Sequence, residues 1–483
     1  MKKIILLTAF ITLITSCSNE ITSLNEDIKN PTTTKPEYLF TNAEKALVDQ
    51  MVSTSVNFNV YRMFSQQWTE TTYPDESQYN IATRTIPDNH FTVLYKDVLR
   101  DFKESQILLD AEVAPTPADE AILNNKKAMV DILMVYTYSV LVDTFGDVPY
   151  SEALDIVNHP LPKYDDAETI YRDLIARLAA DSALLTSGAA SFEGADLIYG
   201  GDADSWKKFA NSLQLKLAVN MYDVDPAFAS TSIMTAVTSG VFTSNGDNAN
   251  LNYLSLQPNA NPLYADLVIS GRNDFIPANT LVDKMNSLSD PRREKYFTFK
   301  SGTTSYVGGI YGSSNSFTNF SHINETLADP TFPGTILDYS EVEFLLAEAA
   351  ARGVAVGGTP ETHYTAGITA SMENWGVATA DILAYLAQPS VAYATATGTW
   401  QQKIGEQSWL ALYNRGFEAW TSYRRLDFPQ LAPPAVTYND LAEVPKRYTY
   451  PAREETLNST NVTAASAAIG GNTLVTKIFW DVN

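Results

Sequence analysis

The sequence contains a single cysteine, Cys17, among its 483 residues. One cysteine cannot form an internal disulfide, so its presence needs another explanation. Histidine is almost as scarce, with four in the chain. The sequence has no H-E-x-x-H or Cys/His zinc pattern, no G-x-S-x-G elbow and no phosphate-binding glycine loop. We therefore predict no metal site, no cofactor and no catalytic residue, and a protein that is not an enzyme.

Positive charge is also in short supply. The chain has 33 Lys and Arg against 56 Asp and Glu, which gives a formal net charge of −23. An acidic surface repels phosphate backbones, so nucleic acid is not expected as a partner. No apolar run of about 20 residues, the length of a membrane-spanning helix, follows the N-terminal segment. No transmembrane helix is predicted.

The N-terminus has the form of an export signal. Residues 1–16 begin with two lysines and continue as a short apolar stretch, the pattern of a signal peptide. This stretch ends in LITSC, which resembles a bacterial lipobox, so we predict that Cys17 carries a lipid anchor. Residues 17–36 are rich in Ser, Thr, Asn and Pro and are predicted to be a flexible tether. Residues 37–483 are then predicted to form a single domain.

Helical periodicity dominates that domain. Apolar residues recur three or four positions apart over seven segments. These predicted helices cover residues 37–55, 91–112, 119–143, 165–185, 204–221, 338–352 and 406–422. Strand-like pieces are few, with 474–482 as one candidate. Long polar stretches at 69–90 and 300–335 interrupt the helices, and connections of that length are often functional. The sequence predicts a mainly α fold with one irregular, loop-rich side.

Several motifs, in the same order along nearly the whole chain, resemble the SusD/RagB family. They are LNEDIKNP at 24–31, DTFGDVPYSEA at 143–153, WKKFANSL at 206–213, DPR at 290–292, DYSEVEFLLAEA at 338–349, RGFEAW at 415–420, YRRL at 423–426, VPKR at 444–447 and YP at 450–451. The resemblance implies a SusD-like fold, in which four tetratricopeptide-type helix pairs support an irregular ligand face. It also implies that Trp206 and Phe209 are core residues.

The resemblance also implies a function. A member of this family is expected to be a lipoprotein of the outer membrane, facing the cell exterior, that captures an oligo- or polysaccharide. It is expected to deliver this glycan to a SusC-like TonB-dependent transporter. Because some members take peptides, a peptide ligand is an alternative. A glycoside hydrolase that uses two carboxylates is a third interpretation, since 56 acidic residues allow many pairs.

Two long stretches combine aromatic rings with polar side chains, as a sugar-binding surface requires. The candidate ligand residues are Trp68, Tyr73, Asp75, Gln78 and Tyr79 in the first stretch, Tyr306, Tyr311, Asn315, Phe317 and Phe320 in the second, and, as a weaker third group, Arg272 and Asp274. We predict that the first two stretches form one shared aromatic surface. The alternative is that these rings pin the loops onto the helices, with Trp68 in the core.

Overall fold

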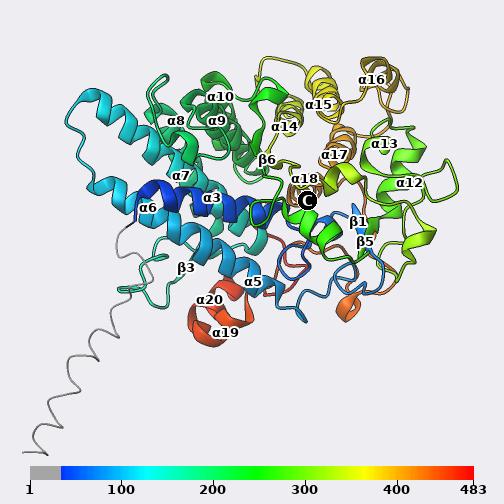
Figure 1. Ribbon diagram of the computed structural model, residues 1–483, viewed down its shortest axis with the longest axis horizontal. Coiled ribbons are helices and arrows are strands. Elements are labelled where there is room, and N and C mark those ends of the chain that lie inside the picture. Colours follow the sequence, from blue (N-terminus) through cyan, green and yellow to red (C-terminus); the bar gives the residue numbers. More distant parts are fainter. Residues whose placement is uncertain (1–33, 483) are drawn as a thin grey trace, which may run out of the picture.

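The computed structural model describes residues 34–482. The predicted signal peptide, Cys17 and most of the predicted tether lie outside the described residues. Helices dominate the structure and the strands are short (Figure 1), which confirms the mainly α fold. The tetratricopeptide type of the helix pairs and the single domain at 37–483 stay predictions.

The N-terminal half consists of helices that pack in sequence order. They are α3 (Pro36–Val52), α4 (Tyr61–Phe64), α5 (Ile86–Thr92), α6 (Arg100–Ala111), α7 (Pro117–Phe145), α8 (Ala167–Leu184), α9 (Ala203–Asn220) and α10 (Pro226–Ser239). Helix α3 packs on α6, and each helix from α6 to α10 packs on the next. The side chains of Thr116, Asp166, Asp202 and Asp225 accept hydrogen bonds from the first turns of α7 to α10. Such N-caps satisfy amides that a helix leaves unpaired.

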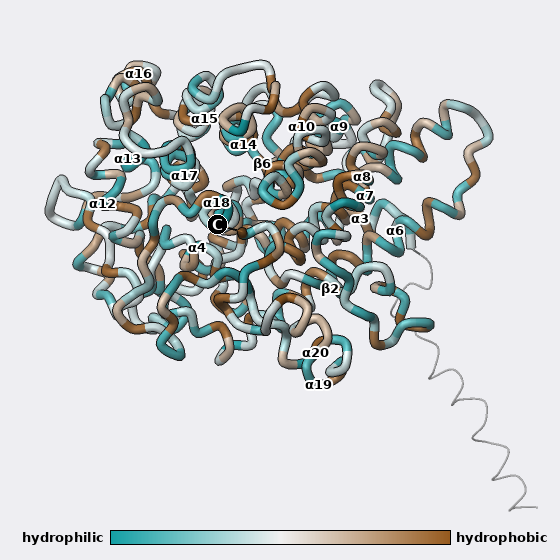
Figure 2. Tube along the Cα trace, turned by 180° about the vertical axis from the view of Figure 1, so that it is seen from behind, coloured by the Kyte–Doolittle hydropathy of each residue, from teal (hydrophilic) through white to brown (hydrophobic). Residues whose placement is uncertain are grey.

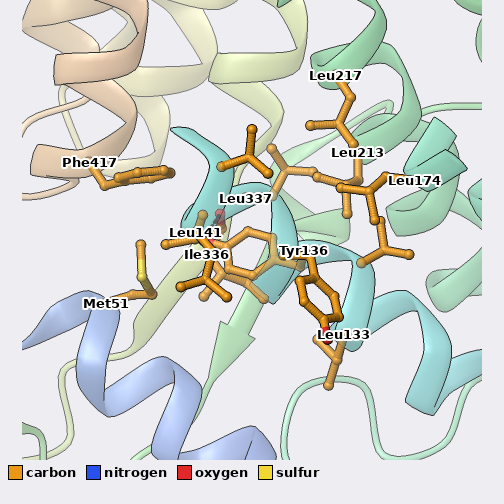
Figure 3. Close-up of a cluster of buried hydrophobic side chains, with 14 of the residues drawn as sticks. Met51, Leu133, Tyr136, Leu141, Leu174, Leu213, Leu217, Ile336, Leu337 and Phe417 are labelled. Carbon is orange, nitrogen blue, oxygen red and sulfur yellow. Dashed lines mark hydrogen bonds between the residues drawn. The ribbon is translucent and has the colours of Figure 1, made fainter. Parts of the chain in front are cut away.

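Helix α7 is the central element of this half. By length and composition it could cross a membrane, but 94% of its most apolar window is buried inside the protein. Around it lie side chains from distant elements, including Met51, Leu174, Leu213 and Ile336 (Figure 3). The predicted core residues Trp206 and Phe209 are fully buried in the same cluster.

The C-terminal half adds a second group of helices, most of which lie in the upper right of Figure 1, while the last two lie at its lower centre. They are α11 (Pro262–Tyr264), α12 (Asn279–Ser287), α13 (Arg293–Tyr296), α14 (Tyr339–Ala351), α15 (Pro360–Asn374), α16 (Thr379–Leu386), α17 (Trp400–Ala411), α18 (Gly416–Leu426), α19 (Ala452–Leu457) and α20 (Ser459–Ala468). Helices α14, α15 and α17 pack on one another, and α18 packs on α17. Hydrophilic and hydrophobic residues alternate along most helices, as expected when one face is buried (Figure 2).

The structure corrects two predicted elements. The predicted helix at 406–422 is two helices, α17 and α18, because the chain turns between them and Asn414 has a positive φ of 69°. Residues 474–482 form turns and irregular backbone rather than the predicted strand. Short 3-10 and π segments complete the helical elements: η1 (Val93–Leu99), η2 (Glu193–Ala195), η3 (Asn245–Asp247), η4 (Ala265–Ile269), η5 (Phe317–Asn319), η6 (Glu325–Ala328) and η7 (Tyr438–Asp440).

Each strand in the described residues pairs with a segment far away in the sequence or across a loop. The antiparallel pairs are β1 (Trp68–Glu70) with β5 (Phe275–Pro277), β2 (Val148–Pro149) with β3 (Tyr164–Asp165), and β4 (Ala249–Leu251) with β6 (Gly334–Leu337). The β1–β5 and β4–β6 pairs attach the long irregular stretches to the helices. They therefore decide which loop residues meet.

A buried carboxyl pair is formed by the last residue of β1 and a residue of the loop that follows it. Glu70 and Glu76 are almost completely buried and share a hydrogen bond. Burial first, then the hydrogen bond and charge of Glu76, raise the pKa of Glu70 from 4.5 to about 9. Between these two pH values the folded protein binds more protons than the unfolded chain. Stability contributed here therefore falls as pH rises from about 4.5 to about 9.

Glu70→Gln should remove this dependence, because the amide stays neutral and can still donate a hydrogen bond to Glu76. We expect the difference in Tm between the variant and the wild type to grow in the variant's favour from pH 5 to pH 9, within the window set by that pKa. Thermal unfolding at several pH values measures this. Exposed Glu112 provides the control Glu112→Gln, which should leave the difference flat. A constant difference for Glu70→Gln would contradict the assignment.

Candidate functional site

The two predicted ligand loops lie side by side, although they are far apart in the sequence. The backbone N–H of Asn315 donates to the carbonyl of Thr71 at 2.6 Å, and the side chain of Gln78 donates to the carbonyl of Gly312 at 2.8 Å. The third predicted segment joins them, because the N–H of Thr71 donates to the carbonyl of Asp274 at 2.9 Å. The fold thus brings together the segments that the sequence singled out.

Trp68, however, is not an exposed platform. Its side chain is fully buried, its indole N–H donates to the Tyr413 hydroxyl at 3.1 Å, and the Arg62 guanidinium lies 5.0 Å from its ring centroid. The pairing of β1 with β5 directs this residue into the core. The prediction that Trp68 contacts ligand is therefore wrong, and the core alternative holds.

The same correction applies to three more predicted residues. Tyr79, Tyr311 and Asn315 are all buried. The Tyr311 hydroxyl donates to the Met63 carbonyl at 2.7 Å, and the Asn315 amide donates to the Glu70 carbonyl at 3.0 Å. These side chains pin the loops to the helices, because their polar atoms are used inside the protein.

The remaining predicted residues keep some exposure. Tyr73 is 58% exposed. Asp75, Gln78, Asp274, Tyr306, Phe317 and Phe320 are half-buried, and Arg272 is exposed. Several already have partners: Phe317 stacks on His322 with ring centroids 3.8 Å apart, and Arg272 pairs with Asp274 at 2.6 Å. A role for these residues in ligand binding stays a prediction.

The structure contains a cleft that the sequence analysis did not identify. It has a volume of about 240 Å³ and is lined by residues in or next to α3, β4, β6, α15, α17 and α18. Its lining comprises Met51, Val52, Asn250, Phe332, Pro333, Thr335, Asp338, Asn374, Trp375, Ala411, Tyr413, Asn414, Arg415 and Glu418. The combination of aromatic rings, amides and charged groups is the one a sugar site needs.

An aromatic wall forms one side of this cleft. Trp375 and Phe332 are half-buried, with ring centroids 6.1 Å apart and planes inclined by 31°. Tyr296 packs edge-on against Trp375 at 4.7 Å, and Tyr413 lies 6.0 Å away on the cleft side. These contacts fix the Trp375 ring, so a ligand that stacks on it loses little additional side-chain entropy.

The opposite side is set by the β4–β6 pair. Asn250 and Thr335 are cross-strand partners, and the Thr335 hydroxyl donates to Asn250 Oδ1 at 2.6 Å. Phe332 and Pro333 lead into β6, so the pairing also positions part of the aromatic wall. Gly334 is required here, because a Cβ at this position would come within 2.5 Å of Val48.

Charged residues form the floor. Arg415 lies 3.0 Å from Asp338, 2.6 Å from Glu341 and 3.7 Å from Glu418. Burial alone would lower the pKa of Arg415, but these carboxylates outweigh it and raise that pKa overall. Burial raises the pKa of Glu418, which Lys216 and Arg415 only partly offset. The charged groups of the floor therefore pair with one another.

Sequence reasoning missed this cleft because its walls come from segments separated by more than 300 residues. One local signal was available in the motif RGFEAW, whose Arg415 precedes α18 and lines the cleft. Trp375 directly follows α15, a helix that the periodicity analysis did not include.

Comparisons with known proteins agree with the fold. The chain matches, over residues 28–451, the model of a SusD-like family described as starch-binding and associating with the outer membrane. A chitin-binding protein is 29% identical with a TM-score of 0.79, and the alignment covers 93% of this chain and 100% of that chain. A chitin-binding SusD homologue from Flavobacterium johnsoniae is 25% identical with a TM-score of 0.76, covering 93% and 98%.

A SusD homologue from Bacteroides uniformis is 26% identical, with a TM-score of 0.77 and coverage of 92% of this chain and all of the other. Among curated proteins, none matches this chain in sequence. The family model spans most of the chain, which confirms the resemblance to SusD/RagB proteins. The chain therefore belongs to the SusD-like family of proteins that associate with the outer membrane.

Proposed function

We propose that this protein captures oligosaccharides or polysaccharides of the chitin class in its cleft and delivers them to a SusC-like TonB-dependent transporter. The observation that carries the proposal is the half-buried Trp375, held by neighbouring rings at the edge of a cleft that also presents amides. The apolar face of a sugar ring stacks on such a side chain, and amides bond to its polar edge. Two structural relatives that are chitin-binding proteins support this substrate class.

A binding role accounts for the carboxylates of the cleft better than hydrolysis does. Asp338 caps the first turn of α14 by accepting from the Glu341 N–H at 2.7 Å and also pairs with Arg415. Glu418 accepts from the Tyr136 hydroxyl at 3.3 Å and faces Lys216 and Arg415. A general acid and a general base must be able to exchange protons with substrate or water. Both of these groups are instead occupied by internal partners.

The anchor is part of the same proposal. We propose that Cys17 is lipidated and holds the protein on the exterior face of the outer membrane. The association of the family with that membrane supports this placement. The tether of residues 17–36 would then allow the protein to remain close to a transporter.

Trp375→Ala should weaken binding of N-acetylglucosamine oligomers about tenfold, since stacking is worth about 1 kcal/mol or more per ring and 1.4 kcal/mol is a factor of ten. Isothermal titration calorimetry on the purified protein measures the affinity. Trp68→Ala is the matched comparison, because this fully buried ring should cost about 3–5 kcal/mol of stability when truncated. Trp375→Ala should lower Tm by much less.

Tyr73→Ala tests the alternative surface, because Tyr73 is the most exposed of the predicted loop aromatics. If Tyr73→Ala abolishes binding and Trp375→Ala does not, the ligand lies on the loops and the cleft assignment is wrong. Release of shorter products from the oligomer, lost on changing Asp338 or Glu418, would contradict the binding role.

Cys17→Ala should leave the protein in the soluble fraction or as an unprocessed precursor, because the lipid attachment atom is gone. Cell fractionation followed by mass spectrometry of the N-terminus measures both outcomes. Ser16→Ala is a suitable control, since a small residue before the cysteine is retained. A processed Cys17→Ala protein that still fractionates with the outer membrane would refute lipidation.

A further inference from the structure

Three asparagines line the cleft, and each has its side-chain oxygen already engaged. Asn414 Oδ1 accepts from Arg62 Nε at 3.0 Å, Asn374 Oδ1 accepts from Asn248 Nδ2 at 3.4 Å, and Asn250 Oδ1 accepts from the Thr335 hydroxyl at 2.6 Å. Within residues 34–482, none of the three Nδ2 groups has a hydrogen-bond partner. Each amide therefore keeps both N–H donors free within the described residues, while its oxygen has one acceptor position already used, so donors outnumber acceptors on this lining.

Two of these orientations are fixed by groups that can only donate. Arg62 has no acceptor atom, so the atom of Asn414 that faces it must be the oxygen. The backbone N–H of Tyr339 donates to Asn248 Oδ1 at 2.7 Å, which makes the other side-chain atom of Asn248 a donor. Asn374 must then receive that donor with its oxygen, and its own NH₂ group is left for the cleft.

The backbone supports the same arrangement at Asn414. Its φ of 69° lies in the left-handed region, which asparagine and aspartate adopt more readily than other residues with a side chain. The backbone N–H of Asn414 donates to Gln67 Oε1 at 3.1 Å, which holds the turn in place. The Nδ2 donor of Asn414 is thus preorganised before any ligand arrives.

The charged residues of the floor do not reverse the preference of the cleft for ligand groups that accept hydrogen bonds. Asp338 pairs with Arg415 and caps α14, and Glu418 faces Lys216, Arg415 and Tyr136. Within the described cleft lining, these two are the acidic residues, and both are engaged. An ammonium group on a ligand would meet three N–H donors and two carboxylates that are already paired.

We infer that side-chain amides among Asn250, Asn374 and Asn414 donate hydrogen bonds to the carbonyl oxygen of an acetamido group. The cleft therefore selects N-acetylated sugars over their de-N-acetylated forms. This inference rests on the proposed function and deepens it. The carbonyl oxygen has two lone pairs, so it can accept hydrogen bonds from two of these donors. The ammonium of a glucosamine unit has three donors and no acceptor, so it leaves the amides unpaired and is disfavoured.

The test compares two oligomers of equal length on the full chain: one of N-acetylglucosamine and one of glucosamine, at a pH where the amine is protonated. Calorimetry should give the wild type at least a tenfold preference for the acetylated oligomer. Asn374→Asp and Asn414→Asp replace the NH₂ donor with a carboxylate oxygen. Each should lower affinity for the acetylated oligomer about tenfold, the cost of an unpaired acceptor, and raise affinity for the glucosamine oligomer.

Aspartate at 414 keeps both the left-handed backbone preference and the acceptor for Arg62, so misfolding is not the expected cause of the change. Asn124→Asp on α7 adds the same charge outside the cleft lining and should leave the ratio of affinities unchanged. Far-ultraviolet circular dichroism and Tm confirm that each variant is folded.

The outcomes separate the two proposals. If the wild type binds both oligomers equally, or if the Asn→Asp variants keep the wild-type ratio, the amide inference is overturned while glycan capture stands. If the wild type binds neither oligomer and no other glycan, the proposed function fails. A third outcome is that the wild type binds an unrelated oligopeptide and the same variants bind it more weakly. The three donors would then bind peptide carbonyls, and the acetamido assignment would be overturned.

Discussion

Beneath the cleft, Arg415 sits between three carboxylates that belong to two different helices. Asp338 and Glu341 are at the start of α14, Glu418 is in the first turn of α18, and Lys216 reaches in from α9. A buried ion costs several kcal/mol to desolvate, so these charges are tolerated only in this mutual arrangement. The network thereby fixes the starts of α14 and α18 relative to α9. The cleft is the space that these fixed elements enclose.

None of the candidate ligand residues identified in the sequence lines the cleft, although residues within 332–335, at the end of the second stretch, do. Trp68 is buried, but its indole holds the hydroxyl of Tyr413, whose residue lines the cleft. Arg62 stacks on Trp68 and at the same time orients the amide of Asn414. Trp68 thus helps to position two residues of the cleft lining, Tyr413 directly and Asn414 through Arg62. The enrichment of aromatic residues in the first loop reflects packing of this segment onto the helices.

The sequence predicts those parts of the fold that depend on local periodicity. Helices α7, α8, α9 and α14 lie within a few residues of the predicted segments, because their apolar stripes face one core. The break at Asn414 was missed because the apolar pattern continues across it, while the positive φ is imposed by contacts with distant residues. At 474–482 the apolar spacing suited a strand, but none of the strands within residues 34–482 pairs with this segment.

Exposure of aromatic rings was the hardest property to predict. Trp68 and Tyr73 lie five residues apart in a similar polar context, yet one is fully buried and the other is 58% exposed. The difference comes from the pairing of β1 with β5, which joins positions more than 200 residues apart. Composition and spacing carry no information on such a pairing. The positions of Trp375 and of the three asparagines depend on contacts of the same long-range kind.

The walls of the cleft begin at Met51 and end at Glu418, so the site draws on almost the full length of the described chain. During synthesis the N-terminal helices emerge long before α18, and a molecule without α18 would lack Glu418 from the cleft lining. The complete cleft therefore forms only after α18 has packed. Under the proposed function, a ligand that binds only the complete cleft would stabilise the fully folded molecule over truncated or partly folded forms.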